Sequence, residues 1–294
     1  MPSRTGVINI CKETGYTSHD IVAIVKKITG TKAGHTGTLD PDACGVLPVC
    51  IGRATKFASF FAAEEKTYVS EVVLGVVTDT WDMTGEVLDR KEVSTDKDEI
   101  IRAVESFGFA SRGVYMQVPP MYSAVKVRGK KLYELARKGE TIHREPRPVE
   151  IKEIFVREFM ENGFVMELTC SKGTYVRSLC MDIGEMLGCG AAMGQMTRTA
   201  SGLFRIEDAV TLDDLRNADD LDGVIKPLGD LLPYPALDVL PEWVRFADNG
   251  NPIEVGMLVA PPRNADELFW LSCNCRVVGL YKLSGNKLRP EVML

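Results

Sequence analysis

The sequence predicts an α/β protein of the α+β type, with a smaller β-rich part at its C-terminal end. β-like runs and helical apolar spacings follow one another over about the first 230 residues, and the last fifty or so residues are short apolar runs separated by turn signals. Between the two parts, four prolines fall within fifteen residues, at 227, 233, 235 and 241, and indicate a linker or extended segment. We therefore expect domains over residues 1–234 and 235–294.

The first elements follow from short local signals. Residues 6–10 predict a short buried strand. Ser18 can cap a helix whose apolar residues have helical spacing, and Gly30 can end it. Residues 31–48 are rich in glycine and proline and predict a loop, and a second helix is expected near residues 53–64.

The middle of the chain predicts strands, a hairpin and further helices. Residues 66–77 indicate a long strand, and residues 78–87 a loop that enters another strand. Asn162-Gly163 lies between two β-like runs and predicts the turn of a hairpin. Helices are expected within the run SKGTYVRSLCMDIGEMLG and from residues 211–215.

Several kinds of site are not expected. The glycine-rich run 30–37 lacks both the P-loop spacing and a Gly-x-Gly-x-x-Gly pattern, which argues against a nucleoside triphosphate site. The eight cysteines form no Cys-x-x-Cys pair, and His35 with Asp40 has no evident third ligand. We therefore expect reduced thiols, no metal centre and no cofactor.

Charge is distributed unevenly along the chain. The net charge of −6 speaks at first against a nucleic-acid partner. Residues 121–148, however, carry a net charge of +5, so the remainder carries −11. A basic segment on an acidic body can bind a phosphate backbone, although most charge runs are solvated helix faces.

The run GHTGTLDPDACGVLPVCIGRATK, residues 34–56, is the longest motif in the chain. It resembles the signature of the TruB family of pseudouridine synthases nearly residue for residue. The resemblance continues through KTYVSEVVLG, TDTWDMTG, PPMYSAVKVRGKKLYELARKGE, REPRPVEI, CSKGTYVRSLCMDIGEMLGCGA and TRTASGLF, in that order. It implies the pseudouridine synthase fold, with a mixed, mainly antiparallel central sheet flanked by helices. The C-terminal part resembles a PUA-type RNA-binding domain more loosely.

The resemblance also implies a reaction, the isomerisation of uridine to pseudouridine at position 55 in the T-loop of tRNA. The N1–C1′ bond must break, the base must rotate, and C5 must bond to C1′. Nothing is oxidised and no group is added, so the chemistry needs no cofactor. The site needs an ionised carboxylate, a cation beside it, an aromatic platform and a way to take the base out of its stack.

Three residues are expected to carry this reaction. Asp40 would be the carboxylate; with only Pro41 beside it, it would be a turn residue, and the surrounding signature favours catalysis. It would either attack C1′ to form a covalent adduct or remove a proton from C2′ to form a glycal, and both routes stay open. Arg177 matches the family arginine that pairs with this aspartate. Tyr68 matches the tyrosine that stacks on the base and could take the C5 proton.

Further residues would bind the RNA. His35 matches the histidine that fills the gap left by the flipped nucleotide, and Tyr175 a residue of the active-site wall. Met196 stands where the family usually has leucine, with similar volume. Asp79 and Asp82 would contact RNA or order their loop. The insertion at about residues 119–148 would close over the T-arm with Tyr122, Lys126, Arg128, Lys130, Lys131, Arg137, Lys138 and Arg144.

A cytoplasmic monomer is expected, because one chain carries every needed part and its N-terminal residues lack the apolar core of a signal peptide. No run approaches the roughly 20 apolar residues of a membrane helix. Two other functions stay open: an RNA-binding protein that helps tRNA to fold, with secondary catalysis, and an RNA-guided synthase acting on ribosomal RNA. The complete set Asp40, Tyr68 and Arg177 disfavours the first, and the full insertion favours stand-alone tRNA recognition over the second.

Overall fold

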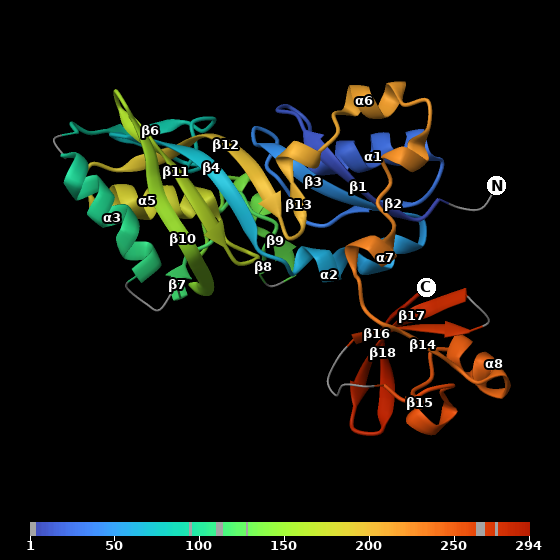
Figure 1. Ribbon diagram of the computed structural model, residues 1–294. Coiled ribbons are helices and arrows are strands. Elements are labelled where there is room, and N and C mark those ends of the chain that lie inside the picture. The colour runs from blue at the N-terminus through green and yellow to red at the C-terminus, as the bar shows by residue number, and fades with distance from the viewer. Residues whose placement is uncertain (1–3, 94–95, 110–113, 128, 263–267, 274–275) are drawn as a thin grey trace.

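A nine-stranded sheet forms the body of the molecule (Figure 1). The computed structural model describes residues 4–93, 96–109, 114–127, 129–262, 268–273 and 276–294. The strand order is β1-β3-β12-β4-β11-β10-β7, with β2 paired to β3 and β13 paired to β12. The strands are β1 (Gly6–Lys12), β2 (Ala33–His35), β3 (Cys44–Ile51), β4 (Lys66–Leu74), β7 (Val114–Gln117), β10 (Arg147–Met160), β11 (Gly163–Cys170), β12 (Ala191–Ser201) and β13 (Phe204–Arg205).

One parallel junction interrupts an otherwise antiparallel sheet. β3 and β12 run parallel, with Cys44 opposite Thr197 and Gly45 opposite Arg198, and the other neighbouring pairs of this sheet are antiparallel. Gly45 has a φ of 101°, and a Cβ atom there would lie 2.3 Å from the carbonyl oxygen of Arg198. The junction therefore requires glycine at this position. The predicted mixed, mainly antiparallel sheet is confirmed.

Helices flank this sheet. α1 (Ser18–Thr29) packs beside β2 and β3, α5 (Val176–Met186) against β12, and α3 (Lys97–Phe109) against β10. Side chains alternate between buried and half-buried along β4, as expected where one face of a strand meets the core. The shorter helices are α2 (Ala58–Ala62), α4 (Leu132–Ala136), α6 (Leu212–Asn217), α7 (Leu228–Leu231) and α8 (Val244–Asp248), with 3₁₀ turns η1 (Gly52–Phe57), η2 (Ile206–Asp208), η3 (Leu221–Gly223), η4 (Pro241–Trp243) and η5 (Val255–Met257).

Local predictions held best where a turn or cap residue marked the boundary. Gly30 ends α1 in the left-handed conformation, at φ 66°, and its N–H donates to Lys26 O at 3.0 Å. The predicted hairpin of β10 and β11 is present, but its turn is Glu161-Asn162, one residue earlier than expected, because Gly163 already pairs with Met160 as the first residue of β11. The N-cap of α1 is Thr17 and not Ser18, because the Thr17 hydroxyl accepts from the backbone N–H of Asp20 at 3.1 Å.

Three other predictions need correction. Residues 31–48 are not one loop, since β2 and the start of β3 lie within them. The helix expected near 53–64 is the 3₁₀ turn η1 followed by the short α2. The long strand expected over 66–77 breaks at Gly75, whose φ of 76° ends β4; β5 (Val76–Thr78) then pairs with β6 (Val87–Arg90) in a separate ribbon.

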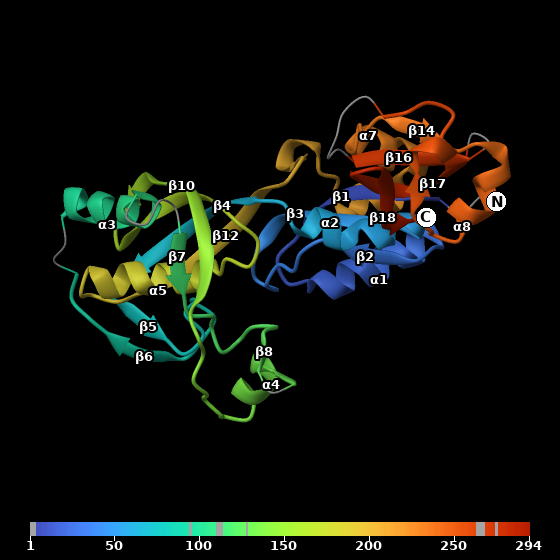
Figure 2. The ribbon, with the colours of Figure 1, turned by 90° about the horizontal axis from the view of Figure 1, so that it is seen from below.

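The basic insertion extends away from the main sheet (Figure 2). It contains the short hairpin of β8 (Lys126–Val127) and β9 (Lys130–Lys131), followed by α4. Its own apolar cluster has Met121, Leu132 and Leu135 as the buried members. The insertion is therefore a small unit with little core of its own.

A second, five-stranded sheet follows the proline-rich segment, as the turn signals predicted. Its order is β14-β16-β17-β18-β15, and it lies beneath α2 and α7 in Figure 1. The ring centroids of Phe57 and Trp270 are 5.6 Å apart, and the Trp270 indole N–H donates to Leu232 O at 2.8 Å. Its strands are β14 (Ala236–Asp238), β15 (Ile253–Glu254), β16 (Leu268–Cys273), β17 (Arg276–Ser284) and β18 (Lys287–Met293).

Two global features concern only the part of the chain that the structure describes. None of its helices is both long and apolar enough to cross a bilayer. Its seven cysteines are free thiols, and Cys275 lies outside the described residues.

Candidate active site

A cavity of about 690 Å³ lies beside the parallel junction between β3 and β12. Its wall is assembled from segments that are far apart in the sequence: the loop before β3, strand β4, the loop after β5, the base of the insertion, helix α5 and strand β12. The predicted site residues that line it are Asp40, Tyr68, Asp82, Tyr122, Arg137, Tyr175, Arg177 and Met196.

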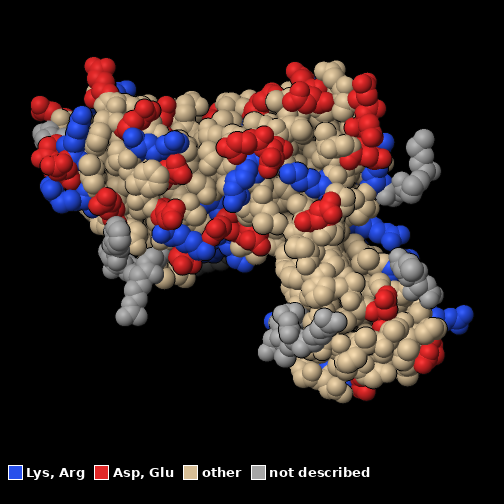
Figure 3. All heavy atoms as spheres, in the orientation of Figure 1, with Lys and Arg blue, Asp and Glu red and all other residues tan. Residues whose placement is uncertain are grey.

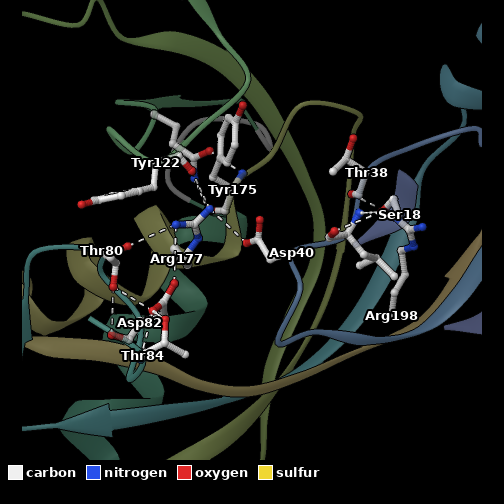
Figure 4. A network of polar contacts seen from close by, with 12 residues as sticks. Ser18, Thr38, Asp40, Thr80, Asp82, Thr84, Tyr122, Tyr175, Arg177 and Arg198 are labelled. Atoms are coloured by element: carbon white, nitrogen blue, oxygen red, sulfur yellow. Dashed lines mark hydrogen bonds and ion pairs between the residues drawn. The ribbon is translucent and has the colours of Figure 1, made fainter. Parts of the chain in front are cut away.

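Asp40 and Arg177 form an ion pair in this cavity (Figure 4). Asp40 Oδ2 lies 3.0 Å from Arg177 Nη2, and the Arg177 side chain is 6% exposed whereas that of Asp40 is 40% exposed. The predicted pairing is therefore present. The carboxylate is accessible to a substrate, and the guanidinium that balances its charge is fixed inside the protein.

The guanidinium of Arg177 contacts three segments. Besides Asp40, it lies 3.5 Å from the Asp82 carboxylate, and it donates to Thr80 O at 3.3 Å and to Tyr122 O at 2.9 Å. Figure 4 shows Asp40 on one side of the guanidinium and Thr80 and Asp82 on the other. The loop after β5 and the base of the insertion thus both contact the Arg177 side chain that pairs with Asp40.

Competing effects act on the Asp40 carboxyl. Burial raises its pKa, the Arg177 guanidinium opposes this, and the nearby Asp82 carboxylate adds to the rise, so the pKa lies above its ordinary value. A raised pKa makes the ionised carboxylate a better base and nucleophile, and the ion pair retains the ionised form.

The loop around Asp40 is anchored on both sides of that residue. The Ser18 hydroxyl accepts from Leu39 N–H at 2.8 Å and lies 3.0 Å from Leu39 O. The buried Lys12 ammonium donates to Pro41 O at 2.9 Å and to Ala43 O at 2.5 Å. The direction of the Asp40 side chain is therefore set by the scaffold.

Two tyrosines contribute to the wall. Tyr68 projects from β4 and is 8% exposed; burial raises its pKa, and neighbouring Arg198 opposes the rise. Tyr175 immediately precedes α5, and its backbone is held by Gln117, which donates to Tyr175 O at 2.9 Å and accepts from its N–H at 2.7 Å. Met196 is buried on β12 and supplies the apolar wall expected of it.

Other predicted site residues lie elsewhere. His35 is on β2, outside the residues that line the cavity, and burial lowers its pKa, so its ring is neutral at pH 7. Asp79 accepts from Glu86 N–H at 2.8 Å and orders its loop. The insertion lysines Lys126, Lys130 and Lys131 lie on the β8–β9 hairpin away from the cavity wall, and Arg128 lies outside the described residues.

Arg144 also lies away from the wall, and its guanidinium carbon is 5.2 Å from the centroid of the Trp81 ring. By contrast, Arg137 of the insertion does line the cavity. The basic residues of the insertion therefore differ in their position relative to the cavity.

Sequence reasoning missed Arg198 and Lys66. Arg198 is 1% exposed and donates to Val46 O at 2.7 Å and to Gly37 O at 3.2 Å, so it fastens the glycine-rich loop to β12. Lys66 shares the buried face of β4 with Tyr68, and burial lowers its pKa to about 8. A period-2 reading of KTYVSEVVL would have placed Lys66 on the core side, which is unusual for lysine and signals a special environment.

Comparison with known proteins agrees with this arrangement. The model described as TruB family pseudouridylate synthase, N-terminal domain, matches residues 25–176, and that of the tRNA pseudouridylate synthase B C-terminal domain matches residues 177–233. The tRNA pseudouridine synthase B of Alkaliphilus oremlandii is 44% identical over 86% of this chain and 84% of its own length. That of Bacillus licheniformis is 43% identical over 90% of this chain and 86% of its own length.

Solved structures extend the likeness. A chain of a Cbf5-Nop10-Gar1 complex matches with a TM-score of 0.71 and 29% identity, covering 98% of this chain and 84% of that one. A chain of an H/ACA RNP bound to a substrate RNA containing 2′-deoxyuridine matches with a TM-score of 0.69 and 26% identity, at the same coverage. With two family models that together span residues 25–233 and relatives above 40% identity over most of its length, the chain belongs to the TruB family of tRNA pseudouridine synthases.

Proposed function

We propose that this chain isomerises uridine 55 in the T-loop of tRNA to pseudouridine, with Asp40 as the reacting carboxylate. The observation that carries the proposal is the ion pair of Asp40 and Arg177 in a cavity that Tyr68 and Tyr175 also line. Relatives named tRNA pseudouridine synthase B support tRNA as the substrate.

Two routes fit the geometry. In one, an Asp40 oxygen attacks C1′, the N1–C1′ bond breaks, and uracil leaves as an anion. In the other, Asp40 removes the C2′ proton as uracil leaves, which gives a glycal. The base then rotates and C5 bonds to C1′; in the first route the bond from Asp40 to C1′ breaks in this step, and in the second C2′ takes back a proton. In both, the C5 proton is then removed and N1 of the product is protonated. Arg177 would stabilise the Asp40 charge whenever the carboxylate is free.

Tyr68 is assigned to stacking on the base. Its pKa is raised by burial, so its phenol is protonated at neutral pH. Stacking on an aromatic ring is worth about 1–3 kcal/mol per base, which is enough to offset part of the cost of flipping. Removal of the C5 proton by Tyr68 stays a separate prediction.

The basic insertion would hold the T-arm through its phosphates while the cavity receives the flipped base. On the face shown in Figure 3, Lys and Arg are interspersed with Asp and Glu, so that face offers no uniform phosphate surface among its described residues. We assign the insertion over about 119–148 to RNA contact. Residues 235–294 are assigned to a PUA-like RNA-binding domain, and the enzyme to a cytoplasmic monomer.

Asp40→Asn tests the proposal, because it keeps the shape of the side chain and removes its charge. With tRNA tritiated at uridine C5, we expect tritium release to fall roughly 10⁴-fold or more while the tRNA Kd stays within about threefold. Asp42→Asn is the matched control, since Asp42 lies two residues away on the same wall. Wild-type release by the Asp40→Asn protein would refute the assignment.

An RNA-guided reaction on ribosomal RNA is the second candidate, favoured by the likeness to the H/ACA structures. Turnover of unmodified tRNA by the purified chain alone would exclude a need for a guide. Turnover that appears only when a guide RNA is added would favour the second candidate.

A tRNA-folding role beside catalysis can be measured with the same Asp40→Asn protein. The protein should speed refolding of an unmodified tRNA if binding and base extrusion alone serve that role. Refolding at the rate of free tRNA would remove support for it.

A further inference from the structure

Trp81 lies between the two residues through which the loop after β5 contacts Arg177. The Thr80 carbonyl precedes it and the Asp82 carboxylate follows it. Among the non-glycine residues that the structure describes, Trp81 alone has a positive φ, 64°. This region is unfavourable for a bulky side chain and persists only where the surroundings hold it. The backbone at Trp81 therefore sets the direction of both groups that face Arg177.

Hydrogen bonds around Trp81 fix this turn. Met193 N–H donates to Trp81 O at 3.0 Å, and the Thr78 hydroxyl donates to Asp82 O at 2.7 Å. The Thr84 hydroxyl donates to Asp82 Oδ1 at 2.6 Å, which leaves Oδ2 facing Arg177 (Figure 4). These bonds fix the backbone of the turn and the Asp82 side chain, but none of them involves the indole ring of Trp81.

Arg144 covers that ring. Its guanidinium carbon is 5.2 Å from the ring centroid, within the range of a cation–π contact. Nη1 donates to Pro119 O at 3.1 Å, and the buried Nε has no hydrogen-bond partner among the described residues. Burial also lowers the pKa of Arg144. An arginine placed to grip phosphate would present its donors outward, whereas half-buried Arg144 directs Nη1 to Pro119 O and keeps Nε inside the protein.

Arg144 therefore joins three places. It belongs to the C-terminal end of the insertion, it bonds to Pro119 at the other end, and it stacks on the loop that contacts Arg177. Tyr122, three residues after Pro119, supplies another carbonyl to Arg177. A shift of the stack would thus disturb the contacts of Arg177 from two sides.

We propose that Trp81 and Arg144 form a latch that closes the base of the insertion and positions Arg177 against Asp40. Both are positioning residues, and Arg144 is not a phosphate contact. The proposal rests on the roles assigned above to Asp40 and Arg177. It predicts that losing the stack lowers the rate of the bound complex without weakening tRNA binding.

Arg144→Lys separates the two roles of arginine, because lysine keeps the charge and loses the planar stacking surface. We expect the single-turnover rate at saturating tRNA to fall about tenfold, since small displacements of catalytic groups are costly. The tRNA Kd should stay within about twofold, with an unchanged salt dependence. Wild-type turnover with weaker, less salt-dependent binding would show a phosphate contact and overturn the latch.

Trp81 variants test the other half of the latch. Trp81→Gly removes the ring, and glycine adopts the positive φ without strain, so the turn itself should fold. It should be as slow as Arg144→Lys, whereas Trp81→Phe keeps a ring and should stay near the wild-type rate. The double variant Trp81→Gly with Arg144→Lys should be no slower than either single variant. The proposal would be overturned if the rate loss of the double variant were the product of the two single losses. It would also be overturned if Trp81→Phe and Trp81→Gly lost the same amount of rate.

Lys97→Ala is the matched control, because it removes another cation stacked on a ring, 4.9 Å from the Phe159 centroid and outside the cavity wall. Its rate should equal that of the wild type. Thermal melting of every variant shows whether a rate loss follows from unfolding; a loss that tracks melting temperature would reduce the stack to a structural role. If Asp40→Asn is inactive and the latch variants turn over normally, only the latch fails.

Discussion

The cavity around Asp40 and the insertion over residues 119–148 differ in how their charged side chains are held. Arg177 is buried and fixed by four partners, and the Asp40 loop is anchored by Lys12 and Ser18 to the main sheet and α1. The apolar cluster of the insertion has three buried members, and the described basic side chains of the insertion are mostly exposed. Buried, paired charge suits a rate-determining site because it needs no rearrangement, whereas exposed charge suits binding to a phosphate backbone.

Among changes to the cavity other than Asp40→Asn, Arg177→Met should have the largest effect on turnover. It leaves Asp40 and Asp82 near each other without their shared cation, so the Asp40 pKa should rise further and the ionised form should be less populated. We expect turnover to fall roughly 10³-fold. Tritium release in single turnover measures this, and filter binding should show a tRNA Kd close to that of the wild type.

The matched control for Arg177→Met is Arg157→Met on β10. Arg157 lies 3.4 Å from Glu167, but its side chain is 50% exposed. An exposed ion pair contributes little to the stability of the fold, so we expect activity within about twofold of the wild type. Equal losses in the two variants would mean that any removed arginine impairs the enzyme, and the contrast between buried and exposed charge would not hold.

Asp82→Asn should have a smaller effect with a defined pH signature. It removes one charged contact of Arg177, which we expect to slow turnover roughly tenfold. The Asp82 carboxylate raises the pKa of Asp40, so its removal lowers that pKa. Since the proposed reaction needs ionised Asp40, the acidic limb of the kcat/KM profile should move to lower pH. A limb that moves to higher pH would contradict this coupling.

Lys130→Glu with Lys131→Glu tests the insertion side. We expect the tRNA Kd to weaken on the order of tenfold and the slope of log K against log salt to flatten by about 2. The rate at saturating tRNA should stay unchanged, because neither lysine lines the cavity. Lys26→Glu with Lys27→Glu, in the last turn of α1, is the control for charge reversal elsewhere. A similar loss in both double variants would point to overall charge and not to the insertion.

Sequence reasoning predicted the features that have a local signature. Gly30 as a helix end follows from a left-handed conformation that few residues adopt, and the Asn162-Gly163 signal placed the hairpin turn within one residue of Glu161-Asn162. The pairing of Asp40 with Arg177 followed from motif resemblance, and the structure brings the two side chains together. What these cases share is that the information lies within a few neighbouring residues or in motifs that resemble those of a known family.

The features that were missed depend on distant segments meeting in space. Arg198 bonds to backbone about 150 residues earlier, and only the parallel junction of β3 and β12 brings these segments together. Lys12 holds Pro41 and Ala43 across the β1–β3 pairing in the same way. The place of His35 on β2 also depends on such a pairing, with β3, whereas its expected role of filling the gap left by the flipped nucleotide stays a prediction.

Leu132→Ala should have a small effect on turnover and give the sharpest test of how independent the two regions are. Leu132 is fully buried in the cluster of the insertion. A Leu→Ala change in a packed core costs about 2–5 kcal/mol, which a cluster with three buried residues cannot absorb. The insertion should therefore open locally while the main sheet stays folded.

Limited proteolysis should then cut Leu132→Ala within residues 119–148 faster than the wild type, with the main melting transition unchanged and turnover at saturating tRNA reduced only a few-fold. Leu179→Ala is the matched control, because Leu179 on α5 is equally buried but belongs to the main core. It should lower the main transition without opening the insertion. If Leu132→Ala lowers the main transition as much as Leu179→Ala does, the insertion and the cavity unfold as one unit, and the contacts of Arg177 with Tyr122 couple them more tightly than their separate cores indicate.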